Sequence, residues 1–203
     1  MSRGMLTVLV AVVAIAGLAV LSLGGAYNRL VGLDEQVNEA WSQVENTYQR
    51  RADLVPNLVE TVKGAANFER DTLTAVTEAR AKVGQVNFDG PPTAEQMQAF
   101  QANQDGLSSA LSRLLVVSEQ YPELRATEAF RDLQAQLEGT ENRIAVERRR
   151  YNETAREYNT ARRGFPTVMV AGMLGFTERA YFEAVEGAET APQVDFGGSE
   201  DGG

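Results

Sequence analysis

The 203-residue chain contains no cysteine and no histidine. Without cysteine it cannot form disulfide bonds or thiolate metal sites. Without histidine it cannot build a Ser-His-Asp triad or the Glu-x-x-His pairs of di-iron bundles. Phosphate-binding motifs of the GxGxxG and GxxxxGK[ST] types are missing as well. We therefore expect no cofactor, no metal site and no catalysis, and the sequence does not predict an enzyme.

Basic residues are also scarce. Lysine and arginine number 19 against 28 acidic residues, which gives a formal net charge of −9. This balance argues against nucleic acid as a partner and against broad docking on an anionic lipid surface, because both require basic patches. Three arginine clusters are local exceptions, which we interpret as solvated faces of predicted helices: Arg50-Arg51, Arg148-Arg149-Arg150 and Arg162-Arg163.

Charge is absent altogether from Met5 to Leu23. This apolar run is close to the ~20 residues that a helix needs to cross ~30 Å of hydrocarbon. It predicts a transmembrane helix over residues 5–25, preceded by a short N-terminal segment, residues 1–4. A cleaved signal peptide is the alternative, since Arg3 supplies a positive start and Gly24-Gly25-Ala26 offers small residues for a peptidase. The run exceeds the ~7–15-residue core of a signal peptide, which favours the anchor.

The orientation of this single-pass anchor in the cell membrane follows from the flanking positive charges. Arg3 and the terminal amine lie on one side of the apolar run and Arg29 on the other, so the counts are nearly balanced. We expect a cytoplasmic N-terminus and an extracytoplasmic body. The bilayer is then a partner of residues 5–25.

The period of the sequence beyond the anchor is helical. Apolar residues recur every three or four positions from Leu30 to Val62 and form one stripe that keeps its register across Pro56. Because proline removes a helical hydrogen bond but no glycine or turn cluster lies beside it, we predict a kinked helix from Tyr27 to about Val83. A break with chain reversal at Pro56 is the alternative.

Turn signals divide the remainder of residues 26–186. A loop is predicted from Gly84 to Pro92, and Thr93 with Gln96 forms a capping box at the start of a second helix that stops near Tyr121-Pro122. A third helix is predicted from shortly after Pro122 to about Arg163. Thr167 to Leu174 is expected to cap the bundle as a fourth helix or helical return, with Phe176, Tyr181 and Phe182 anchoring the chain.

These elements predict an all-α protein in which the N-terminal transmembrane helix is followed by an antiparallel up-down bundle of four long helices. The acidic, glycine-rich residues 187–203 show no periodicity, so we predict a disordered tail.

Two local patterns remain. Glu138 and Glu141 lie one turn apart, and we expect carboxylates of this kind to pair with arginine in a polar layer that fixes helix register rather than to perform acid–base chemistry. Tyr151-Asn152 recurs as Tyr158-Asn159, which we attribute to packing of the tyrosine rings between helices.

Three blocks resemble the LemA family. They are YNRLVGLDEQVNEAWSQVENTYQRRADLVPNLVETVKG (Tyr27 to Gly64), LEGTENRIAVERRRYNETAREYN (Leu137 to Asn159), and ARRGFP with YFEA (Tyr181 to Ala184). The resemblance implies a bacterial single-pass membrane protein with an antiparallel helical bundle and no established enzymatic activity. Many members resemble Gly-Tyr-Ala-x-His-Glu where this chain runs from Gly64 to Glu69. This chain has Phe68 at the position of that histidine. A role that requires the imidazole is therefore excluded at this position, whereas a role in packing is compatible with Phe68.

Three functions are compatible with the sequence. The first is a membrane-anchored envelope scaffold that binds another protein or associates with itself. The second is a membrane-surface or remodelling protein that binds lipid through a basic helix face formed by Arg143, Arg148, Arg149, Arg150, Arg162 and Arg163. The third is a metal- or carboxylate-dependent enzyme, which the missing catalytic residue types make the weakest hypothesis.

Overall fold

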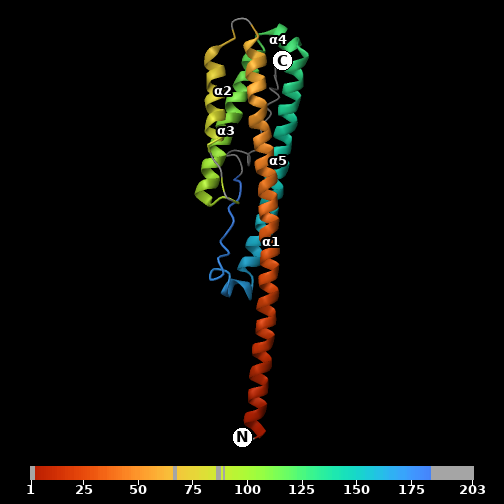
Figure 1. Ribbon diagram of the computed structural model, residues 1–203, viewed down its shortest axis with the longest axis vertical. Helices are drawn as coiled ribbons and strands as arrows, with labels where there is room; N and C mark the ends of the chain where they lie inside the picture. Colours follow the sequence, from red (N-terminus) through yellow and green to blue (C-terminus); the bar gives the residue numbers. More distant parts are fainter. Residues whose placement is uncertain (1–2, 66–67, 86–87, 89, 184–203) are drawn as a thin grey trace, which may run out of the picture.

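The structure, a computed structural model, describes residues 3–65, 68–85, 88 and 90–183. These residues form helices and no strand, as the sequence predicts. The elements are α1 (Arg3–Lys63), α2 (Arg70–Val83), α3 (Ala94–Ser118), α4 (Pro122–Ala126), α5 (Glu128–Arg163) and one 3-10 turn, η1 (Thr167–Met169). Figure 1 shows α1, α2, α3 and α5 side by side with successive helices running in opposite directions, while the first part of α1 extends beyond the bundle.

Helix α1 is continuous from the apolar run into the bundle, through Gly24 and Gly25. Glycine costs only ~1 kcal/mol in a helix interior, and no capping residue or proline interrupts the backbone ladder here. Side chains are exposed throughout residues 4–22 and become periodically buried from Leu30 onward. An 18-residue window of the helix has a mean hydropathy of 2.8, so by length and composition it can cross a membrane.

The predicted helix from Tyr27 to about Val83 is wrong at its C-terminal end. Helix α1 continues through Pro56, as expected, but it ends at Lys63, and α2 begins at Arg70. The reversal therefore lies at residues 64–69 and not at Pro56, so the alternative of a break at the proline is wrong too. Gly64 is the first residue beyond α1 and lies in a turn, and the buried side chains of Thr72 and Val76 hold α2 in the bundle.

The capping box at the start of α3 is confirmed. Gln96 N donates to Thr93 Oγ1 at 3.4 Å, and Thr93 N donates to Gln96 Oε1 at 2.9 Å. The predicted third helix is divided into α4 and α5 by Thr127, whose hydroxyl oxygen accepts from Phe130 N at 3.4 Å and caps α5.

Of the two forms expected for Thr167 to Leu174, the fourth helix is wrong and the helical return is confirmed, because this segment forms η1 and a series of hydrogen-bonded turns. Gly172 lowers its helical propensity, and Gly175 adopts a φ of +81°, a conformation that terminates regular helix. The fourth helix of the bundle is instead α2. The predicted tail, residues 187–203, lies outside the described residues.

The core consists of two clusters stacked along the bundle axis. The cluster nearer the apolar part of α1 centres on Trp41, which stacks on Phe182 with ring centroids 6.1 Å apart and contacts Phe100 and Tyr151 edge-on. The far cluster is mainly aliphatic and includes Leu58, Val62, Leu107, Leu114 and Phe130. The two clusters are called the proximal and distal cores below.

Arg51 joins three helices from a buried position, with only 1% of its surface exposed. Its Nη1 donates to Ser108 Oγ on α3 at 2.6 Å and to Glu141 Oε1 on α5 at 2.8 Å. Its Nη2 donates to the backbone oxygen of Gln104 at 3.1 Å and to the side-chain oxygen of the same residue. The guanidinium also lies 5.1 Å from the ring centroid of Tyr48. The expected pairing of Glu141 with an arginine is therefore confirmed.

Replacing Arg51 should test the importance of this polar junction. We expect Arg51→Ala to lower the free energy of unfolding by about 2–4 kcal/mol, because it leaves buried acceptors on α3 unpaired and removes a three-helix contact. The matched control is Arg50→Ala, an exposed neighbour, which should change stability by less than about 0.5 kcal/mol. Chemical unfolding of the full chain in detergent micelles, followed by circular dichroism, measures both. Equal small effects would contradict the assigned role.

Candidate functional site

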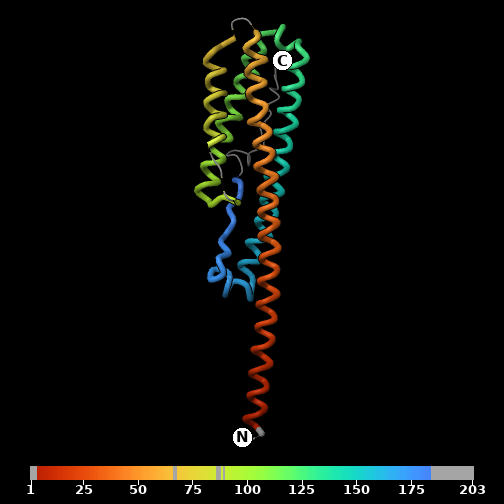
Figure 2. Tube along the Cα trace, in the orientation of Figure 1, coloured from red at the N-terminus to blue at the C-terminus, as the bar shows by residue number. Residues whose placement is uncertain are grey.

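The segment from Phe176 to Glu183 is extended and runs back along the bundle beside α5 (Figure 2). Asparagine side chains hold its backbone. Asn159 Nδ2 donates to Arg179 O at 2.8 Å, while Asn159 Oδ1 accepts from Arg179 N at 2.9 Å. Asn152 makes the same pair with Phe182, donating to its oxygen at 2.9 Å and accepting from its nitrogen at 2.8 Å. Each carboxamide thus pairs with both the N–H and the C=O of one residue, as the backbone of a neighbouring β-strand would.

The spacing of the two asparagines explains why the pairing works twice. Seven residues along a helix advance about 10.5 Å at 1.5 Å each. Three residues along an extended chain advance about 10 Å at ~3.3 Å each. The step from Asn152 to Asn159 therefore matches the step from Phe182 back to Arg179. The sequence predicted tyrosine packing from this repeat, and both tyrosines are buried, but the role of the asparagines was missed.

The two tyrosines of the repeat differ in their polar contacts. Tyr158 Oη donates to Thr177 O at 3.0 Å, which adds a further tie to the extended segment. Tyr151 is fully buried beside Trp41, and its hydroxyl has no hydrogen-bond partner among the described residues. Burial raises the pKa of Tyr151 to about 12, because the phenolate would lose its hydration.

Charged contacts also fix the segment to the bundle. Arg179 Nη2 donates to Asp34 Oδ1 on α1 at 2.6 Å, and Arg162 Nε donates to Phe176 O at 2.8 Å. Arg148 donates to Glu183 O at 3.1 Å and lies over the Phe182 ring. The expected anchoring by Phe176, Tyr181 and Phe182 is confirmed, since Phe182 is buried and the other two pack against the proximal core.

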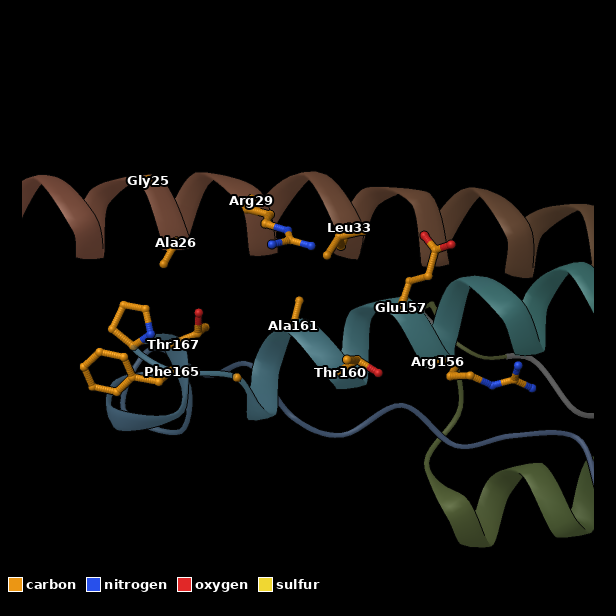
Figure 3. Close-up of a pocket in the computed structure, with 12 residues that line it drawn as sticks. Gly25, Ala26, Arg29, Leu33, Arg156, Glu157, Thr160, Ala161, Phe165 and Thr167 are labelled. Carbon is orange, nitrogen blue, oxygen red and sulfur yellow. The ribbon is translucent and has the colours of Figure 1, made fainter.

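A cleft of about 830 Å³ lies where α1 enters the bundle (Figure 3). One wall is α1 around Gly25, Ala26 and Arg29, and the other is the end of α5 with the following turn. Arg29 and Arg156 both line the cleft and form no ion pair within the described part of the chain. Glu157 is the carboxylate that lines it. The cleft thus combines guanidinium groups with small and apolar surfaces.

The remaining sequence candidates do not converge on a reactive centre. Glu138 accepts from Gln134 on the surface of α5 at 3.0 Å. Residues 3–65, 68–85, 88 and 90–183 contain no group of three or more acidic side chains placed to hold a metal ion. Phe68 is buried in the distal core, with its ring centroid 5.0 Å from that of Tyr121, so the packing role expected for this position is confirmed.

The fold and the site define a class, that of an up-down helical bundle continuous with an N-terminal helix able to span a membrane. The profile of the LemA family matches residues 40–196, so the chain belongs to the LemA family.

The chain is also similar to individual relatives. It is 27% identical to magnetosome protein MamQ 2 of Paramagnetospirillum magneticum, over 81% of this chain and 67% of the relative. It is 26% identical to magnetosome protein MamQ of Magnetospirillum gryphiswaldense, over 96% of this chain and 79% of the relative. Protein LemA of Metamycoplasma hominis is 26% identical over 80% of this chain and 71% of its own length.

Replacing each tyrosine of the repeat by phenylalanine should affect the free energy of unfolding differently. Tyr151→Phe removes an unpaired buried hydroxyl, so stability at neutral pH should stay unchanged or rise by up to about 1 kcal/mol. Tyr158→Phe removes the bond to Thr177 O and should cost about 1 kcal/mol.

Because the folded-state pKa of Tyr151 is raised, the chain should lose stability as pH rises from about 10 to about 12. Tyr151→Phe should lose less over that interval. Thermal unfolding across this pH range measures the effect, and identical slopes would contradict it.

The asparagine pairing predicts local release of the extended segment. Asn152→Ala removes both bonds to Phe182, which covers Trp41, the only tryptophan of the chain. We expect tryptophan emission to shift to longer wavelength and quenching by acrylamide to increase, with little loss of helical circular dichroism. Asn142→Ala, at an exposed position on the same helix, is the control and should leave the emission unchanged. An unshifted spectrum for Asn152→Ala would show that the ring contact holds without the carboxamide.

Proposed function

We propose that this protein is a membrane-anchored scaffold of the bacterial envelope, whose bundle presents a binding surface to another protein or to a second copy. It performs no catalysis in this proposal, and its body lies on the extracytoplasmic side. The observation that carries the proposal is the continuity of α1, which supplies both the apolar segment and the central stripe of the bundle. The relatives named as magnetosome proteins support a role of this kind at a membrane.

Rigidity at the junction supports the scaffold role. Tyr27 packs edge-on against Phe176 with centroids 5.7 Å apart, just beyond the apolar run. About two helical turns further along α1, Asp34 pairs with Arg179. The extended segment therefore braces α1 where the bundle begins, and no flexible linker separates anchor from bundle. A partner bound to the bundle would be held at a defined height above the membrane.

The alternative, lipid binding through a lateral basic face, draws less support from the contacts. Three of the six arginines considered for that face have intramolecular partners: Arg148, Arg162 and Arg163. Arg143, Arg149 and Arg150 remain exposed on α5, interleaved with acidic side chains. The enzyme hypothesis has no cluster of reactive side chains to support it in the described part of the chain.

Site-specific photo-crosslinking of the full chain in cells tests the scaffold proposal. Photoreactive residues are placed at exposed positions on the four bundle helices: Asn46 on α1, Glu78 on α2, Ser109 on α3 and Glu153 on α5. We expect a reproducible protein adduct, with a partner or a second copy, from positions on one side of the bundle. Absence of any protein adduct from all four positions would reject the scaffold.

A matched pair of changes at the junction extends this test. A flexible Gly-Ser linker inserted between Ala26 and Tyr27 should weaken the adduct, because it frees the bundle from its fixed height. Replacing Gly24 and Gly25 by alanine should preserve the adduct, since a Cβ at either position meets nothing within 4 Å and the helix is strengthened.

A further inference from the structure

We propose that the turn formed by residues 164–175 rests in the headgroup–acyl boundary of the bilayer that α1 crosses, as a second membrane contact of the bundle. The proposal depends on α1 spanning the membrane, and it requires no protein partner. Its starting point is an uncharged stretch, GFPTVMVAGMLG, which lies between Arg162-Arg163 and Glu178. A stretch of this composition is unusual on the surface of an acidic bundle.

The turn exposes apolar side chains that the bundle does not use. Their exposed fractions are 84% for Phe165, 53% for Val168, 67% for Met169, 88% for Met173 and 50% for Leu174. Elsewhere on the described bundle, exposed large apolar residues such as Val116 and Val146 occur singly. A cluster of exposed apolar side chains marks an interaction surface, whereas isolated ones need no explanation.

The position of the turn relative to α1 indicates that the bilayer covers the exposed apolar side chains of the turn. Figure 3 shows Phe165 across the cleft from Gly25 and Ala26, at the end of the cleft nearer to the apolar part of α1. The hydrocarbon core is filled by Met5 to Leu23, and the headgroup layer extends about 5–7 Å beyond it, or about four residues of helix. Gly25, Ala26 and the turn beside them therefore lie within that layer.

The backbone of the turn is suited to this environment, where unpaired polar groups are costly. Val168 N donates to Gly164 O at 2.9 Å, and Ala171 N donates to Thr167 O at 2.9 Å. Leu174 N donates to Val170 O at 3.0 Å. Thr167 and Ala171 are buried against the bundle, so the turn has an inner face that fixes it and an outer face that is apolar.

The polar groups around the turn match a lipid surface as well. Arg29 lines the adjoining cleft without an ion pair among the described residues, and a guanidinium binds phosphate oxygens through paired donors. Tyr27 lies at the same level, where aromatic side chains with a polar end are favoured at membrane interfaces. Apolar insertion flanked by arginine is the pattern of an interfacial membrane contact.

Single cysteines introduced into the cysteine-free full chain test this placement. The chain is reconstituted into phosphatidylcholine vesicles and labelled with an environment-sensitive fluorophore at Phe165→Cys or Met173→Cys. Val146→Cys is the matched control, because it is also an exposed apolar position but lies about five helical turns before Phe165 along α5. Val13→Cys, within the apolar run, verifies that α1 is inserted.

We expect nitroxide lipids labelled near the headgroup to quench the probes at Phe165 and Met173 several-fold more strongly than the probe at Val146. Quenching equal to that at Val146 would overturn the proposal. So would a blue-shifted but unquenched probe whose signal grows with the protein-to-lipid ratio, because a second copy would then cover the turn. Stronger quenching by nitroxides at the bilayer centre would overturn the interfacial depth. An unquenched probe at Val13 would reject the insertion of α1 and with it this contact, without bearing on protein binding by the bundle.

Discussion

The continuity of α1 from the apolar run into the bundle is the constraint on which the rest of the structure depends. Because the helix carries no break between the apolar run and the bundle, its buried stripe has a fixed rotation relative to the anchor. Helix α5 packs along this stripe, and Arg51 ties α3 and α5 to it through side-chain hydrogen bonds. The proximal and distal cores are thus two halves of one surface of α1, separated by the polar junction around Arg51.

Much of this architecture is predictable from local sequence. The helical apolar run, the buried stripe from Leu30 and the capping box at Thr93 each depend on residues within a few turns of one another, and the structure contains all three. The end of α1 at Lys63 was missed because a single glycine, Gly64, is only a weak stop signal. The helix passes through Pro56 as predicted, since proline inside a long amphipathic helix can be tolerated when packing holds both sides. Burial of Val55, Leu58 and Val59 around the proline supplies that packing.

The candidate sites were harder to predict, because they depend on contacts between distant segments. Nothing local marks Asn152 and Asn159 as partners of an extended chain, since the match of helical rise to strand rise appears only when the segment lies beside α5. Likewise, the apolar segment after Phe165 has the composition of a short helix. Its exposure and its place beside Ala26 follow from the tertiary structure alone. The Arg51 junction was predictable only in part. The sequence indicated that a carboxylate such as Glu141 pairs with an arginine, but it did not indicate which helices the arginine would join.

The stacking of Phe182 on Trp41 has a consequence for biosynthesis. The ribosome makes α1 before it makes the C-terminal segment that carries Phe182. Until that segment emerges, the proximal core lacks Phe182, and the Trp41 ring stays partly uncovered. The distal core has all its elements once α5 has begun, so it can close earlier. Assembly should therefore proceed from the far end of the bundle toward the membrane, with the last contacts made nearest the anchor.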